Sequence, residues 1–427
     1  MSLGGGSAGS RPTGSRQAER RSAVITGLGV IAPNGIGAEA FWKAVREGVG
    51  VLDRISREGC QDYPLKVAGE VRAFDPGAAV EDRYLVQTDR FSHFAMAAAD
   101  MALAGAGLRS DKESPYAVGV VTAAGSGGNE FGQHELERLW GKGPQFVGPY
   151  QSIAWFYAAS TGQISIRGGF KGPCGVVAAD EAGGLDAIAH ACRGIRRGAD
   201  AMVVGAAEAP LIPYSIVCQL AFPELSRATE PDHAYLPFSA GACGFVPAEG
   251  GAMLVVEEEW TARLRGAPIR ARVAGHGATF TGPPGWPGTR EGLARAARMA
   301  LERARCAPEE VDVVFADALG VPEADRAEAL ALADVLGPRA GRVPVTAPKA
   351  GYGRAYCGAP PLDVTCAVFA LEHGIVPPTP RVTETACDLD LVTGRARRAE
   401  LRTALVLSRG LMGSNAALVL RRAEGDD

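Results

Sequence analysis

The stretch that decides the fold is GPCGVVAADEAGGLDAIAHACRGIRRG, residues 172–198. The short apolar run Gly175–Ala178 predicts a buried strand. After it, apolar residues recur every three or four positions, which predicts a helix with one buried face: Leu185, Ile188, Ala189, Cys192 and Ile195. Acidic residues near the helix start, arginines near its end and Gly198 behind them match the helix dipole and a C-terminal cap. The stretch therefore predicts a strand, a tight turn and a helix.

The residue at this turn is Glu181. In acyl-transfer enzymes a strand-turn-helix elbow exposes a nucleophile, and the helix N-terminus stabilises its anion. Cys174 lies seven residues before Glu181 and upstream of the strand, so we interpret it as a structural cysteine.

The string AADEAGGLDA, residues 178–187, resembles the VAEQAGGLDA-like string of chain-length factors, the ketosynthase β subunits of type II aromatic polyketide synthases. These proteins belong to the thiolase-fold β-ketoacyl synthases. The strings QSIAWFYAASTGQISIRGGFKG (151–172) and AYLPFSAGACGFVPAEGGA (234–252) are also similar to chain-length-factor strings, and the resemblance covers nearly the whole chain after Ala23. Catalytic synthases carry cysteine at the elbow and chain-length factors usually carry glutamine, so Glu181 departs from both.

The predicted fold is α/β. Strands and helices alternate in both halves of the chain, which predicts mainly parallel sheets. The resemblance implies a thiolase-like fold, with two pseudo-symmetric halves and mixed sheets layered between helices. We expect a disordered leader over 1–22, an N-terminal half over 23–260 and a C-terminal half over 261–427.

Composition excludes several function classes. Apolar residues make up 47% of the chain and charged residues 22%, which suits a large buried core. The net charge of −4 includes a basic leader, so the remainder is acidic and a nucleic-acid partner is not expected. No apolar run approaches the roughly 18 residues of a membrane span. The nine cysteines show no CxxC pair and no metal-ligand spacing, so we expect reduced thiols, no metal site and a cytoplasmic protein.

The string GLGVIA, residues 27–32, mimics a dinucleotide-binding fingerprint. Pro33, Asn34 and Gly35 follow at once, where the fingerprint requires a helix that opens over a pyrophosphate. We therefore expect no nucleotide and no other cofactor.

Two further strings resemble those that carry the catalytic histidines of β-ketoacyl synthases. The first, VVFADAL (313–319), places Asp317 at the first histidine position, and the second, TAPKAGYGR (346–354), places Arg354 at the other. The six histidines of the chain lie outside both strings. The resemblance therefore implies a subunit that does not condense acyl groups by itself.

Other residues match the frame of the synthase site: Lys349, Asp325 and Glu328. We expect a buried structural ion pair between Glu328 and Lys349. Glu181 leaves two interpretations open. It is either a negative charge at a helix N-terminus, or a group that assists malonyl decarboxylation, for which it must carry a proton.

A helix is predicted over Asn129–Trp140, after the glycine-rich hinge 125–128. Its residues Asn129, Gly132, Gln133 and Leu136 share one face and match the family's chain-length pocket. Small side chains there predict a deeper tunnel and a comparatively long polyketide. The alternative is that Gly132 only permits close helix packing.

The resemblance implies a chain-length-determining subunit that pairs with a catalytic ketosynthase α subunit and acts on malonyl units carried by acyl carrier protein. Two alternatives stay open. One is a self-sufficient homodimeric condensing or decarboxylating enzyme that uses Glu181, and the other is a structural partner without influence on the product.

Overall fold

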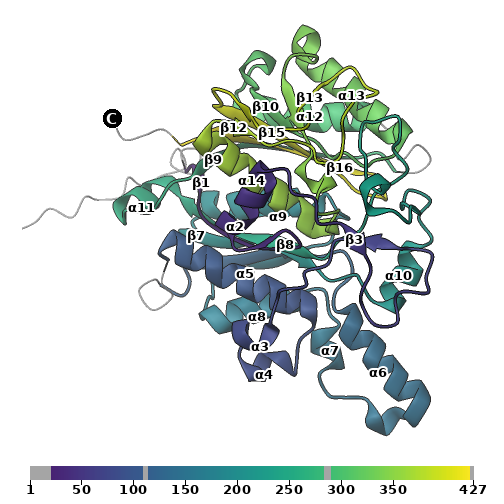
Figure 1. Ribbon diagram of the computed structural model, residues 1–427. Coiled ribbons are helices and arrows are strands. Elements are labelled where there is room, and N and C mark those ends of the chain that lie inside the picture. Colours follow the sequence, from purple (N-terminus) through teal and green to yellow (C-terminus); the bar gives the residue numbers. More distant parts are fainter. Residues whose placement is uncertain (1–20, 109–113, 283–289, 424–427) are drawn as a thin grey trace, which may run out of the picture.

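The computed structural model describes residues 21–108, 114–282 and 290–423 (Figure 1). The expected leader lies outside the described residues apart from Arg21 and Ser22. Within these ranges, none of the helices combines the length and the apolar character that a membrane span requires.

The strands form one mixed 12-stranded sheet, and we call the part that each half of the chain contributes a wing. The N-terminal wing has the strand order β6-β5-β7-β8-β1. These strands are β1 (Ala23–Ala32), β5 (Val118–Ala123), β6 (Cys174–Val177), β7 (Ala201–Glu208) and β8 (Gly250–Glu258), and the short β2 (Gly35–Ile36) pairs with β1. All residues of β1, β5, β7 and β8 are buried, as their continuous apolar sequences predict.

The C-terminal half contributes the other wing, in the order β11-β10-β15-β16-β9, with β13 at its outer edge. These strands are β9 (Ala271–Phe280), β10 (Val313–Phe315), β11 (Pro344–Thr346), β13 (Asp390–Leu391), β15 (Thr403–Arg409) and β16 (Ser414–Arg422). Numbered along each half, both wings follow the order 3-2-4-5-1, so the two halves are pseudo-symmetric as expected. The boundary between residues 260 and 261 stays a prediction.

The expectation of mainly parallel sheets is wrong for the middle of the sheet. The outer pairings, such as β5 with β6 and β10 with β11, are parallel, but β8 and β16 run antiparallel to both of their neighbours. The wings join through β1 and β9, which are antiparallel and place Val24 opposite Arg272. Each half closes with two successive strands without an intervening long helix, and such a connection favours antiparallel pairing.

Two helices form the central layer between the wings (Figure 1). The first, α9 (Gly183–Arg196), contacts β5 and β7 of one wing and β9 and β16 of the other, and the second, α14 (Ala359–His373), contacts β8, β15 and β16. α14 is apolar nearly all round and is buried from Ala359 to Leu371, as a helix enclosed on all sides must be. α2 (Ala38–Arg46) packs beside it.

Outer helices cover the remaining faces. α5 (Arg90–Ala106) and α8 (Ala159–Gly168) cover the N-terminal wing, and α12 (Arg290–Ala304) and α13 (Pro322–Leu336) cover the C-terminal one. A β-carbon on Gly27 or Gly29 would collide with the carbonyl oxygens of Ala102 and Ala98 of α5. The glycines of the GLGVIA string therefore allow α5 to approach β1 closely. The space that the fingerprint would leave for a pyrophosphate is filled by α5.

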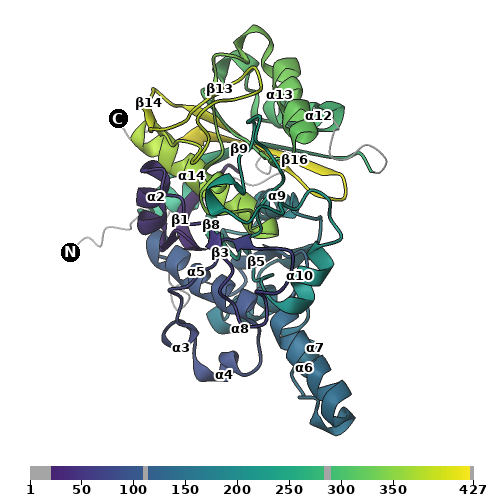
Figure 2. The same cartoon turned by 45° about the vertical axis from the view of Figure 1, so that its right-hand side comes forward.

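The smaller elements lie between these layers and at the rim: α3 (Pro76–Ala79), α4 (Asp82–Leu85), α6 (Asn129–Lys142), α7 (Gln151–Ala154), α10 (Pro213–Gln219) and α11 (Glu259–Leu264), with the strand pairs β3 (Asp53–Arg54) with β4 (Val67–Ala68) and β12 (Ile375–Val376) with β14 (Arg397–Arg398). Among them, α6 projects from the body of the molecule (Figure 2). Its start is anchored by the buried Asp89, whose Oδ2 accepts a 2.7 Å hydrogen bond from the Phe131 amide.

Candidate functional site at the elbow

The elbow connects β6 to α9, and its turn holds Asp180 in the left-handed region at φ 56°. That conformation is uncommon for residues other than glycine, although Asp tolerates it better than most. The turn is fixed by two hydrogen bonds. Asp180 Oδ2 accepts one from the Met412 amide at 2.6 Å, and the Asp180 carbonyl accepts one from Cys357 Sγ at 2.9 Å. This geometry directs Glu181 inward, and only 2% of its surface is exposed.

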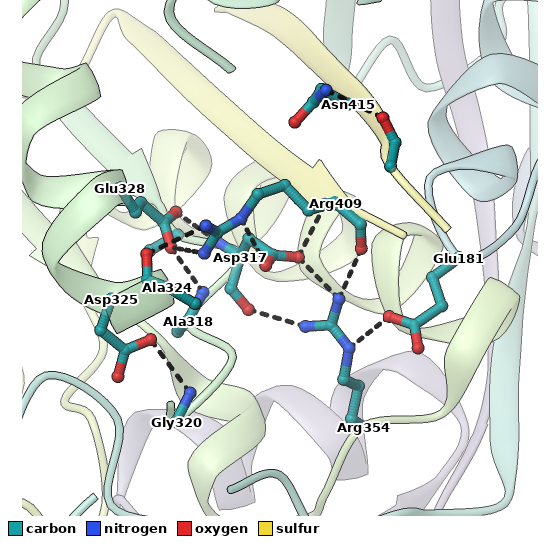
Figure 3. Close-up of polar contacts among 12 residues, drawn as sticks. Glu181, Asp317, Ala318, Gly320, Ala324, Asp325, Glu328, Arg354, Arg409 and Asn415 are labelled. Atoms are coloured by element: carbon teal, nitrogen blue, oxygen red, sulfur yellow. Dashed lines mark hydrogen bonds and ion pairs between the residues drawn. The ribbon is translucent and has the colours of Figure 1, made fainter. Parts of the chain in front are cut away.

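The three residues that the family strings single out lie together, as Figure 3 shows. Arg354 Nε donates a hydrogen bond to Glu181 Oε2, and Arg354 Nη2 donates one to Asp317 Oδ1 at 2.8 Å. The same guanidinium donates to the carbonyl oxygen of Asp317 at 3.0 Å and to that of Arg409 at 2.6 Å. Arg354 thus connects the elbow to the loop after β10 and to the end of β15.

Arg409 is a central member of the site that sequence reasoning missed. Its Nε donates to Asp317 Oδ2 at 3.0 Å, and its Nη2 donates to Glu328 Oε2 at 2.9 Å. Glu328 also accepts the amides of Asp317 and Ala318, at 2.7 and 2.9 Å. The available signal was an arginine at the end of the otherwise apolar strand TALVLSR, because a charge in such a place needs a buried partner.

The expected ion pair between Glu328 and Lys349 is wrong, because each residue has a different partner. Lys349 Nζ lies 2.6 Å from Asp363 Oδ2 of α14 and also donates to the Ala316 carbonyl at 2.9 Å. Glu328 pairs with Arg409 instead. Asp325 is also buried and accepts the amides of Gly320 and Phe238, so it fixes two loops.

The buried cluster contains five carboxyl groups and three basic groups. The carboxyl groups are those of Glu181, Asp317, Asp325, Glu328 and Asp363, and the basic groups those of Lys349, Arg354 and Arg409. Burial is the largest influence on the pKa of these carboxyl groups. Burial raises the pKa of Glu181 to about 8, that of Asp325 to about 7 and that of Asp363 to about 6. At Asp317 the same burial is outweighed by Arg354 and Arg409, which lower its pKa to about 2. Asp317 is therefore the charged carboxylate between the two guanidinium groups, while Glu181 holds a proton at neutral pH.

A cavity of about 340 Å³ opens beside the elbow, with Glu181, Asp180 and Glu208 among its lining residues. Glu208 ends β7, and its Oε1 accepts the Gly125 amide at 2.5 Å. Burial raises the pKa of Glu208 to about 7. Much of the remaining wall is apolar and includes Trp155, Pro210, Tyr214, Phe222 and Leu411. We call this space the Glu181 cavity.

The structure brings only Asn129 of the four expected pocket residues to the Glu181 cavity. Gly132 faces Trp155, and a β-carbon on Gly132 would lie 2.7 Å from Trp155 Cδ1. Gln133 lines a separate hollow, and its Oε1 accepts the Tyr214 amide at 2.9 Å. Leu136 is 41% exposed. Their shared helix face therefore does not form one wall of a single cavity within this chain.

The six histidines do not line the Glu181 cavity, and Cys174 lies exposed on β6. Within the described ranges, no group of three or more His, Cys, Asp or Glu side chains is arranged to hold a metal ion.

Comparison with known proteins assigns the family. The profile described as Beta-ketoacyl synthase, N-terminal domain, matches residues 20–262, and that of the C-terminal domain matches residues 270–383. The chain belongs to the β-ketoacyl synthase family. A solved structure, "The ishigamide ketosynthase/chain length factor", superposes on this synthase-family chain with a TM-score of 0.88 at 28% identity, covering 95% of this chain and 100% of that one. A type II PKS acyl-carrier protein in complex with its ketosynthase gives a TM-score of 0.85 at 28% identity, with 94% and 100% covered.

Sequence relatives divide into two groups. The "Putative polyketide beta-ketoacyl synthase 2" of Streptomyces halstedii is 70% identical to this β-ketoacyl synthase homologue, over 94% of this chain and 97% of its own. The "Putative polyketide beta-ketoacyl synthase 1" of the same organism is only 35% identical, over 95% and 99%. The tetracenomycin polyketide synthase ketoacyl synthase beta subunit of Streptomyces glaucescens is 52% identical, over 93% and 98%.

Proposed function

We propose that this chain is the chain-length-determining β subunit of a type II polyketide ketosynthase. The single observation that carries the proposal is the twofold difference in identity to the two synthases of one organism, 70% to synthase 2 and 35% to synthase 1. The chain is therefore the counterpart of the second synthase subunit.

The proposed subunit does not condense acyl groups by itself. Condensation requires a nucleophilic thiolate together with groups that stabilise the oxyanion. At the matching positions this chain has Glu181, Asp317 and Arg354, and Arg354 binds both carboxyl groups. Cys357 lines the Glu181 cavity, but burial and nearby carboxyl groups raise the pKa of its thiol well above its usual range, so it is not a thiolate.

The proposed partners are a catalytic ketosynthase α subunit and acyl carrier protein. Strand β6 lies at the end of the sheet and pairs only with β5 among the described strands. Large apolar side chains are exposed nearby in the segment that leads from α7 into α8, including Trp155, Phe156 and Tyr157. An open strand edge beside such a surface supports association with another protein. All nine cysteines are free, which fits a proposed reducing, cytoplasmic compartment.

The proposed chain-length pocket comprises Asn129, Gly132, Gln133 and Leu136 on the projecting helix α6. α6 projects from the body, and Leu136 is exposed, which leaves it available to a tunnel shared with the partner, whereas Asn129 and Gly132 are buried. A larger residue at Gly132 would displace Trp155 toward that space.

The test is the product of the complex reconstituted from this chain, a cysteine-bearing ketosynthase and malonyl-loaded carrier protein. Gly132→Trp should shorten the principal polyketide, and Leu136→Phe should act in the same direction. Gly141→Trp is the matched control, because a β-carbon at Gly141 meets no atom within 4 Å. Unchanged product length in both pocket variants, with normal assembly, would contradict the proposal.

A further inference from the structure

The Glu181 cavity contains two polar atoms that no partner satisfies. Glu181 uses Oε2 to bind Arg354, whereas its Oε1 is buried without a hydrogen bond. Ser215 of α10 is only 5% exposed, and its Oγ is also unpaired. Both residues line the same space. A buried polar atom without a partner is costly, so two of them at one cavity indicate a ligand that completes them.

Several other polar groups at this cavity already have partners. Glu208 accepts from the Gly125 amide, and Asp180 accepts from the Met412 amide. Gln219 donates to two carbonyl oxygens and accepts from the Tyr356 hydroxyl. Glu181 Oε1 and Ser215 Oγ are therefore the two buried side-chain oxygens of the described lining that still lack a partner.

The described wall of this cavity offers no cation to an acidic ligand. Three carboxyl groups line the cavity, and the described residues around it include no Lys, Arg or His. The nearby Arg354 already donates to Glu181, Asp317 and Arg409. A malonyl carboxylate would thus enter an apolar, acidic space without a cation to compensate it. This observation argues against the alternative in which Glu181 decarboxylates malonyl groups.

A neutral carbonyl group fits both free atoms. The protonated Glu181 carboxyl and the Ser215 hydroxyl can each donate a hydrogen bond, and a ketone oxygen accepts without bringing charge. The cavity extends from the elbow to Asn129 and Trp155, which places its outer end beside α6. Trp155 stands between Gly132 and this space.

We infer that the Glu181 cavity is a binding site for a neutral, ketone-bearing acyl segment, held by hydrogen bonds from Glu181 Oε1 and Ser215 Oγ. The inference rests on the proposed function for the source of that segment, the growing poly-β-ketone. The binding chemistry rests on the cavity alone.

A photolabelling experiment tests the site directly. The full chain, purified with its co-expressed ketosynthase, is irradiated with a diazirine-bearing analogue of octane-2,4-dione, and labelled peptides are identified by mass spectrometry. We expect labelling of peptides that contain Trp155 or Cys218. Unlabelled octane-2,4-dione should compete, whereas malonate and hexylammonium should not. Absence of label at the cavity, or equal competition by either ion, would overturn the inference.

Variants assign the contacts. Ser215→Ala and Glu181→Leu should each weaken probe binding roughly three- to tenfold, the loss expected for one hydrogen bond. Glu181→Gln keeps an uncharged donor and should preserve binding. The matched control is Ser160→Ala, which removes another buried serine outside the cavity, bonded to Ser92. Equal binding by Ser215→Ala and the wild type would reject the assigned contacts. Labelling does not depend on product length. If the Gly132→Trp test failed, the proposed function would be contradicted, while the labelling result would still decide whether the Glu181 cavity binds a ketone.

Discussion

Arg354 is the residue on which the buried cluster depends. One guanidinium contacts Glu181 of the elbow, Asp317 after β10 and the Arg409 carbonyl at the end of β15. Removal of one member of a buried ion pair leaves its partner charged and without compensation, which costs more than the pair itself contributes.

We therefore predict that Arg354→Leu lowers the free energy of unfolding by about 3–5 kcal/mol. Asp317 would keep only Arg409 as a direct guanidinium partner. The measurement is chemical denaturation followed by circular dichroism. Arg402→Ala serves as a control, because its pair with Glu400 is 77% and 72% exposed and should contribute at most about 1 kcal/mol. Similar losses for the two variants would contradict the central role of Arg354.

Glu181 gives a second prediction at this scale, on pH dependence. Burial raises the pKa of Glu181 in the folded protein from its usual 4.5 to about 8, so between these values the folded state holds a proton that the unfolded state has released. The contribution of Glu181 to stability is therefore complete below pH 4.5 and is lost as the pH rises toward 8.

Glu181→Gln removes this titration. From pH 5 to 8 the stability of the variant should rise relative to that of the wild type, with a slope of at most about 1.4 kcal/mol per pH unit. Asp325, Glu208 and Asp363 titrate in the same direction in both proteins, so only the difference between the two curves is informative. Parallel stability curves would show that Glu181 is charged in the folded state.

At the scale of elements, the contact between α5 and β1 depends on glycine. Gly29→Ala would force its β-carbon against the Ala98 carbonyl, and the fully buried β1 has no free space into which it could shift. We predict a loss of stability of about 1–3 kcal/mol, as for other overpacked cores. Gly141→Ala in α6 meets no atom within 4 Å and should instead stabilise the helix by roughly 0.5–1 kcal/mol. Thermal unfolding of both variants tests the pair, and equal shifts would refute it.

The elements were largely predictable because apolar periodicity reflects burial. The helix in residues 172–198 follows from its pattern, and the predicted helix over Asn129–Trp140 agrees with α6. The expectation of a buried strand over Gly175–Ala178 is wrong, because β6 lies at the end of the sheet and is only half-buried. The antiparallel middle of the sheet was not predictable from alternation alone, because pairing direction depends on the connection between strands. The partners of Lys349 and Glu328 were missed for a related reason. Asp363 lies within an apolar helix and Arg409 at the end of an apolar strand, so only the packing of α14 and β15 brings them to the cluster.

At the scale of the whole molecule, the open edge of β6 and the exposed aromatic side chains beside it support the proposed association with a second subunit. We predict that co-expression with a cysteine-bearing ketosynthase yields a stable one-to-one complex, with a buried interface above about 2,000 Å². The chain expressed alone should aggregate or form weak homodimers. Size-exclusion chromatography with light scattering measures this, and a stable monomer at micromolar concentration would refute it.

The buried cluster at the elbow also limits which substitutions the protein tolerates. Arg354→His would remove the guanidinium that donates to both Glu181 and Asp317, and Glu181→Cys would leave Arg354 short of an acceptor. Each single step costs a few kcal/mol, against a total stability of about 5–15 kcal/mol for typical domains. The gain of cysteine and histidine at these positions would pass through such variants or change several positions at once. We therefore expect the buried cluster to oppose the gain of condensing activity in this chain by single substitutions.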